Sequence, residues 1–121
     1  MPTFKRIEDI QAWQKARQPT RMIYELTGNG MFAKDFGLRN QIQRAGVSVM
    51  ANIAEGFGRR SDKEFANFLN MAHRSVSQSH LYVALDLNYI DQPSFTKLYE
   101  LLDELSRVTL TLAQHLRGSQ L

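Results

Sequence analysis

The stretch from Ala45 to Ala54 limits the possible folds most, because it carries no charged side chain and still follows a helical pattern. Apolar residues recur there at steps of three and four, which is the spacing of one helix face. The opposite side of the same helix is apolar as well, so the sequence predicts a helix buried on two faces. The first of the two faces consists of Leu38, Ile42, Ala45, Val49 and Ile53.

The same spacing of three and four continues along most of the 121 residues, and no stretch alternates like a strand. It predicts helices over residues 8–27, 37–55, 62–88 and 92–116. Their short connections make neighbouring helices antiparallel. The sequence therefore predicts an all-α protein: one domain over residues 1–121, folded as an antiparallel up-and-down four-helix bundle.

Capping residues mark the ends of these helices. Asp35 and Asp91 are predicted N-caps, and Ser61 with Glu64 has the spacing of a capping box. Gly28 favours the end of the first helix. Pro19 lies inside the first helix, where its missing N–H predicts a kink.

The second apolar face predicts contact with another copy of the chain, because a four-helix bundle buries only one stripe of each helix. The alternative is a helix buried centrally within one chain. Small residues on this face favour close approach of a second helix. Two leucines of the third predicted helix are a second indication of contact between copies. The predicted oligomer interface consists of Val47, Met50, Ala51, Ala54, Leu81 and Leu85.

Few residues offer catalytic or metal chemistry. There is no cysteine, so thiolate sites and disulfides are excluded. His73 and His80 lie about 10 Å apart along one helix, too far for one metal ion. Glu55 could act as a general base, but pairing with an arginine is favoured. We therefore expect a protein that is not an enzyme and has neither metal nor cofactor.

The first ten residues do not resemble a signal peptide, and no apolar run is long enough to span a membrane. Together with the missing cysteines, this favours the cytoplasm.

Positive charge gathers in the first half of the chain. Residues 1–63 contain 11 Lys or Arg and six acidic residues, whereas residues 64–121 contain four and six. Such asymmetry suggests an anionic partner, although composition alone favours a solvated surface that happens to be basic. Arginine suits phosphate, and the absence of interleaved aromatic residues points to contacts with backbone rather than bases. The candidate nucleic-acid contacts are Arg17, Arg21, Arg39, Arg44, Arg59, Arg60 and Lys63.

Several motifs resemble those of a known bacterial family, the 23S ribosomal RNA intervening-sequence proteins. The most specific are Asn52-Ile53-Ala54-Glu55-Gly56, Gly58-Arg59, Trp13-Gln14-Lys15-Ala16 and Phe36-Gly37-Leu38. The resemblance covers most of residues 9–76 and implies a four-helix bundle that forms a homopentameric ring. A related branch, the accessory proteins of retroelement reverse transcriptases, binds nucleic acid through a basic surface. Met50, Arg74 and Gln78 depart from the family pattern.

Two functions follow as hypotheses. The first is a homo-oligomer, which the resemblance makes a pentamer, that binds structured RNA, ribosomal RNA or a nucleoprotein through its basic surface. The second is a protein–protein adaptor or accessory subunit without nucleic-acid affinity of its own. An enzyme built around Glu55 is a third hypothesis, and it lacks convergent partner residues.

Overall fold

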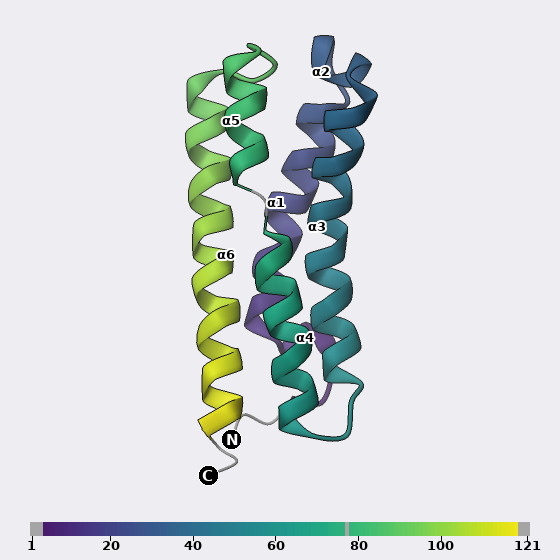
Figure 1. Cartoon of the computed structure of the whole chain (residues 1–121), viewed down its shortest axis with the longest axis vertical. Coiled ribbons are helices and arrows are strands. Elements are labelled where there is room, and N and C mark those ends of the chain that lie inside the picture. Colours follow the sequence, from purple (N-terminus) through teal and green to yellow (C-terminus); the bar gives the residue numbers. More distant parts are fainter. Residues whose placement is uncertain (1–3, 77, 119–121) are drawn as a thin grey trace.

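A computed structural model describes residues 4–76 and 78–118, and within these ranges the only regular elements are helices. Four long helical rods run antiparallel, and the first and last described residues, 4 and 118, lie at the same end of the bundle (Figure 1). The all-α prediction is thus confirmed for the described part of the chain. The rods are α1 (Gln11–Thr27), α3 (Phe36–Phe57), α4 (Asp62–Ser75) continued by α5 (Ser79–Asp86), and α6 (Gln92–Gly118).

The four helical rods lie at the corners of a square in cross-section, and each packs against two neighbours. Helix α1 contacts α3 and α6, and α4 contacts the same two, so α3 and α6 occupy opposite corners. Leucine, isoleucine and alanine side chains fill the space between them. Two threonines are also buried, Thr27 and Thr109. Each hydroxyl donates to a carbonyl one turn earlier, at 2.7 Å, so neither leaves an unpaired polar group in the core.

Three helix ends form as predicted. Asp35 Oδ1 accepts the N–H of Leu38 at 3.1 Å, and Ser61 Oγ accepts the N–H of Glu64 at 3.1 Å. Asp91 Oδ1 accepts the N–H of Ser94 at 2.8 Å. These side chains satisfy donors that the first turn of a helix leaves open.

The start of the first helix differs from the prediction. A short 3₁₀ turn, η1 (Ile7–Asp9), precedes α1. The carboxylate of Asp9 accepts the N–H groups of Lys5 and Arg6, at 3.1 Å each, and this local turn replaces the first α-helical turn. Another short helix, α2 (Gly30–Lys34), lies within the predicted loop. Helix α1 continues across Pro19, which is buried.

The predicted third helix is wrong as one unbroken element. Helix α4 ends at Ser75, Val76 is extended (φ −66°, ψ 118°), and α5 begins at Ser79. Ser75 Oγ donates to the carbonyl of Met71 at 3.0 Å and lies 3.2 Å from Ser48 Oγ of α3. Ser75 thus contacts both its own helix and α3 at the position where α4 ends.

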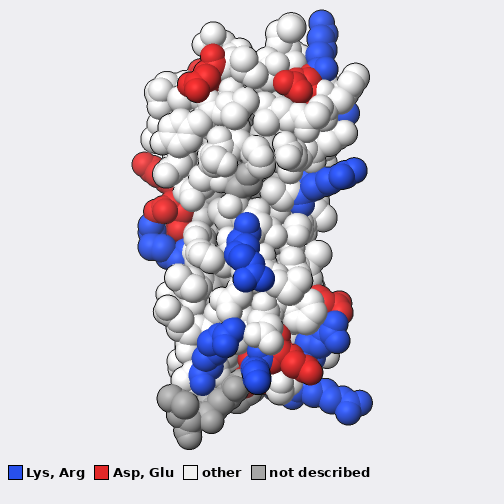
Figure 2. Space-filling model, in the orientation of Figure 1, with Lys and Arg blue, Asp and Glu red and all other residues white. Residues whose placement is uncertain are grey.

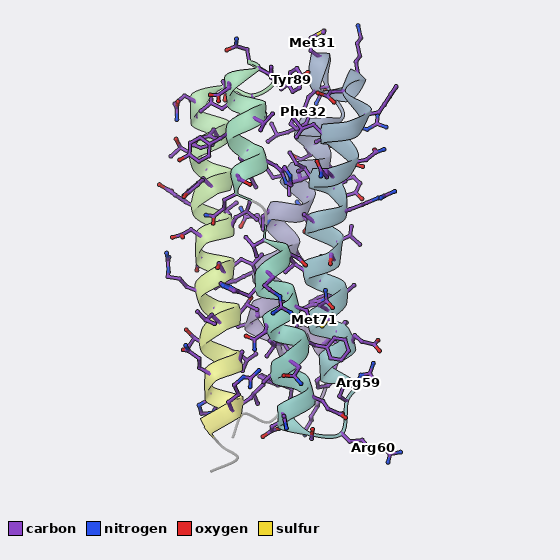
Figure 3. All side chains as sticks on the ribbon, in the orientation of Figure 1. Met31, Phe32, Arg59, Arg60, Met71 and Tyr89 are labelled. Atoms are coloured by element: carbon purple, nitrogen blue, oxygen red, sulfur yellow. The ribbon has the colours of Figure 1, made fainter. Side chains whose placement is uncertain are left out.

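A tyrosine joins the two loops at the other end of the bundle. Tyr89 donates its hydroxyl to Asp35 Oδ2 at 3.0 Å, and its ring stacks on Phe32 with centroids 5.3 Å apart (Figure 3). The hydrogen bond to Asp35, together with desolvation, raises the pKa of Tyr89.

We expect Tyr89→Phe to destabilise the protein at neutral pH and to remove part of its alkaline sensitivity. Because the folded state raises the Tyr89 pKa, its contribution is complete below about pH 10, the usual tyrosine pKa, and is lost above it. Chemical unfolding at neutral and alkaline pH measures both effects. Equal alkaline losses in the two proteins would contradict this role.

Candidate nucleic-acid interface

Helix α3 has one covered side and one open side. Leu38, Ile42, Val49 and Ile53 are buried in the bundle, as predicted. On the other side Val47 is 47% exposed and Ala51 is exposed, while Met50 and Ala54 are half-buried. The second apolar face therefore exists: the chain leaves Val47 and Ala51 open, while Met50 packs in part against its own core. Its contact with another copy stays a prediction.

The two leucines assigned to that interface lie elsewhere. Leu81 is 1% exposed within the core of its own chain, so its assignment is wrong, and Leu85 packs half-buried against the same core. The break before Ser79 explains the error. Faces counted through a continuous helix lose their phase at the break, and Val83 of α5 and Leu87, which follows α5, are exposed instead.

The candidate cations gather around α3. A hollow beside α1 is lined by Arg17, Arg21 and Met50. Arg44 lines a second hollow with Tyr24 and Val47. Lys and Arg side chains are spaced over α3 and α4 and are grouped where these helices join (Figure 2). The structure thus brings cations from separate segments to the two flanks of one helix.

Three of the predicted arginines are engaged within the chain. Arg59 forms an ion pair with Glu55 at 2.7 Å and lies over the ring of Phe68. Arg39 donates to the carbonyl of Ala33 at 2.9 Å. Arg17 donates to Gln14 Oε1 at 3.1 Å. Each of these arginines would have to give up an existing contact to bind a phosphate, which reduces its net contribution to the affinity for RNA.

The side chains of the remaining predicted cations form no ion pair or hydrogen bond with any described residue. Arg60 extends from the α3–α4 loop away from the bundle (Figure 3). Sequence reasoning missed one cation of this group, Arg74. It follows Lys63 by eleven residues, or about three turns, which places both on one helix face, and this spacing could have revealed it. The group consists of Arg21, Arg44, Arg60, Lys63 and Arg74.

The residues considered for catalysis are occupied by structural contacts. Glu55 is exposed and pairs with Arg59, which confirms the favoured interpretation. His73 Nδ1 lies 2.9 Å from Ser106 Oγ and so links α4 to α6. Within the described ranges, no three His, Cys, Asp or Glu side chains converge as metal ligands. Nor does any described helix combine the length and apolarity needed to cross a membrane.

Comparisons with known proteins identify a matching family and a similar fold. The model of the 23S rRNA-intervening sequence protein family matches residues 8–111. One similar solved structure is a protein of unknown function from the S23 ribosomal protein family of Bacteroides thetaiotaomicron. It is 23% identical, with a TM-score of 0.76 over 84% of this chain and 97% of that one, and supports the fold. A search of the curated proteins finds no match.

Proposed function

We propose that this chain, which belongs to the 23S rRNA-intervening sequence protein family, is a non-enzymatic helical bundle that binds structured RNA, or a nucleoprotein, in the cytoplasm. The observation that carries the proposal is the group of cations around α3 and α4 that form no ion pair with an acidic side chain in residues 4–76 and 78–118. Arg44, Arg60, Lys63 and Arg74 belong to that group. Cations without internal partners can release counterions from a phosphate backbone at little cost to the fold.

The spread of these cations favours backbone contacts over base recognition. Arg44 and Arg60 are separated by 16 positions, most of them helical, or roughly 20 Å along the bundle. Such a row can follow several phosphates of a folded RNA. Binding through it should depend strongly on salt and weakly on sequence.

We expect Arg60→Gln/Lys63→Gln to weaken binding to an RNA hairpin and to flatten its salt dependence. Two lost phosphate contacts reduce the slope of log K against log salt by about 1.4 to 1.8. Fluorescence anisotropy over a salt series measures this slope. The matched control is Lys34→Gln/Lys97→Gln, which removes the same charge from exposed positions at the other end of the bundle and should leave the slope unchanged.

Two results would count against the proposal. One is wild-type protein without affinity for any hairpin at low salt. The other is a strong preference for one hairpin sequence at constant shape, because contacts to phosphate alone do not discriminate between bases.

The proposal includes assembly into a homo-oligomer, with the pentamer as its specific form. The open apolar face of α3 supports it, because a second copy would remove Val47, Met50 and Ala51 from water. Helix α3 ends about 15 Å beyond Val47, and Arg60 and Lys63 follow that end, so such contact would leave them accessible. Repetition of these cations around a ring would raise the affinity for one RNA.

We expect Ala51→Glu to convert the assembly into single chains. A carboxylate buried at an interface without a partner costs several kcal/mol, whereas the same residue on the exposed face of a single chain is tolerated. Light scattering should give a multiple of 13.9 kDa for wild type and 13.9 kDa for the variant. Gln114→Glu, on the exposed side of α6, is the charge-matched control. A wild type that is already a single chain would refute the assembly.

One observation favours the adaptor as a second candidate. Tyr82 and Val83 of α5, and Leu87 directly after it, are each between 44% and 51% exposed. Such a group of apolar side chains is typical of a protein-binding surface. A partner that stays bound after nuclease treatment and is lost in Leu87→Ser would support the adaptor over the RNA-binding bundle.

A further inference from the structure

Two surfaces with open apolar side chains lie on opposite sides of the bundle. The first is the groove between α1 and α3, which exposes Tyr24 and Val47, and the second is the edge between α5 and α6, which exposes Tyr82 and Val83. All four side chains are between 44% and 49% exposed. Because α1 and α3 form one side of the square and the α4–α5 rod forms the opposite side with α6, one chain cannot bring its two surfaces together.

The groove between α1 and α3 is hollowed along its length. Tyr24 and Val47 line a hollow of about 520 Å³, and Arg21 and Met50 line the next hollow, one turn away along the same two helices. None of the described residues that line either hollow is acidic. Arg21 is exposed and forms no ion pair with a described residue. The groove therefore combines apolar side chains with a positive charge that is open to a partner.

The surface between α5 and α6 is held in place by aromatic contacts. The ring of Tyr82 packs edge-to-face on the rings of Phe95 and Tyr99 of α6, with centroids 4.9 and 5.9 Å apart. Because Tyr82 is already fixed, a contact through its open half costs little side-chain freedom. Asp86 follows Tyr82 by four positions, so it lies on the same face of α5, and it is exposed.

The two surfaces carry opposite charges. Asp86 of α5 and Glu100 of α6 are exposed, and neither forms an ion pair with a described residue. Contact between two like surfaces would bring the arginines, or the acidic side chains, of two copies toward each other, and like charges oppose association. Contact between unlike surfaces brings Asp86 and Arg21 together instead. Charge complementarity therefore favours a head-to-tail contact.

We propose that Tyr82, Val83 and Asp86 of one copy dock into the α1–α3 groove of a second copy, where Asp86 pairs with Arg21. The inference rests on the assembly that the proposed function includes, and it names the two surfaces that meet. Because the two surfaces lie on opposite sides of each chain, the contact repeats from copy to copy until a ring closes. The α5–α6 surface is then closed to any other protein.

This contact leaves the cations of the proposed function uncovered. Arg60 and Lys63 lie where α3 joins α4, and Arg74 lies near the end of α4. Lys and Arg side chains are spaced over these two helices (Figure 2), on the side of the square between the two docking surfaces. Every copy in a ring would thus present the same cations to RNA.

Two variants test the contact by complementation. Val47→Glu places an unpaired carboxylate in the groove, and Val83→Glu places one in the α5–α6 surface. Both positions are exposed in a single chain, so each variant should fold and should have a mass of 13.9 kDa by light scattering. Mixed in equal amounts, the two variants should form a complex of two chains, because each supplies the surface that the other lacks.

A charge exchange tests the ion pair without burying a carboxylate against apolar groups. Arg21→Glu and Asp86→Arg should each raise the concentration at which the assembly half-dissociates by at least about tenfold. Arg21→Glu/Asp86→Arg restores opposite charges at every contact and should recover most of this loss. Lys34→Glu, an equal change of charge at an exposed position of α2, is the control and should leave the value unchanged.

The possible failures are distinguishable. If Val83→Glu keeps the mass of the wild-type assembly, or if the mixed variants remain single chains, the head-to-tail contact is overturned, while assembly through α3 and RNA binding stand. A charge exchange that recovers nothing overturns the pairing of Asp86 with Arg21. A wild type that is a single chain refutes the assembly and this contact together, and fluorescence anisotropy with an RNA hairpin then decides separately whether RNA binding stands.

Discussion

Gly56→Ala should lower the free energy of unfolding by about 2–3 kcal/mol, the cost of overpacking a close helix contact. An added Cβ at this position would lie 2.7 Å from Phe68 Cβ and 2.9 Å from Phe65 Cδ1. The carbonyl oxygen of Phe65 would be 3.3 Å away. Because two of these neighbours are a Cβ and a backbone atom, they cannot move without shifting α4 away from α3.

Urea unfolding measures the effect, with an unchanged m-value as evidence that the same structure unfolds. Gly37→Ala is the control in the same helix. Its added Cβ would meet nothing closer than 3.8 Å, so we expect no loss, or a gain of up to about 1 kcal/mol from higher helix propensity. Equal midpoints for the two variants would show that α3 and α4 do not approach as closely as the structure has them.

The glycine contact also shapes the candidate interface. Gly56 lets α4 approach the end of α3, and Arg59, Arg60 and Lys63 lie in the connection and the first turn that join these two helices. The Gly56→Ala variant should therefore weaken RNA binding through displaced cations, in addition to its effect on stability. A steric feature of the fold thus positions charges that carry the proposed function.

The sequence predicts the helices because their signals are local. Caps at Asp35, Ser61 and Asp91 act within one turn, and the inner stripe from Leu38 to Ile53 repeats at the helical period. The break after Ser75 has no such signal, since neither glycine nor proline occurs there. It is accompanied by a contact between Ser75 and Ser48, 27 positions apart, which only the folded chain creates.

The sequence predicted the positions of the candidate cations only in part. Charge asymmetry directed attention to the first half of the chain, and Arg44 and Arg60 of that half are exposed. Which arginines are already engaged could not be read from spacing alone. Arg39 turns to a carbonyl of the short helix α2, which was predicted as a loop. Arg74 lies outside the basic half, and its proximity to Arg44 arises from the packing of α4 against α3.

The second large effect is expected for Leu81→Ala, a loss of about 2–4 kcal/mol in the free energy of unfolding. The side chain is 1% exposed, so truncation removes buried contacts and leaves a cavity. The burial comes from the chain itself, and the number of chains in any assembly should not change. An interface residue would behave in the opposite way, with altered assembly and little change in the unfolding of a single chain.

Leu87→Ala is the matched control, because Leu87 directly follows α5 and is 51% exposed. It should change the free energy of unfolding by no more than about 0.5 kcal/mol. Denaturant unfolding combined with light scattering on both variants separates the two roles of Leu81. A Leu81→Ala protein that unfolds like Leu87→Ala but dissociates on dilution would show that Leu81 belongs to the oligomer interface. Helix α5 would then have to be rotated so that Leu81 faces outward. Loss of stability with unchanged mass would instead establish that the break before Ser79 directs this leucine into the core.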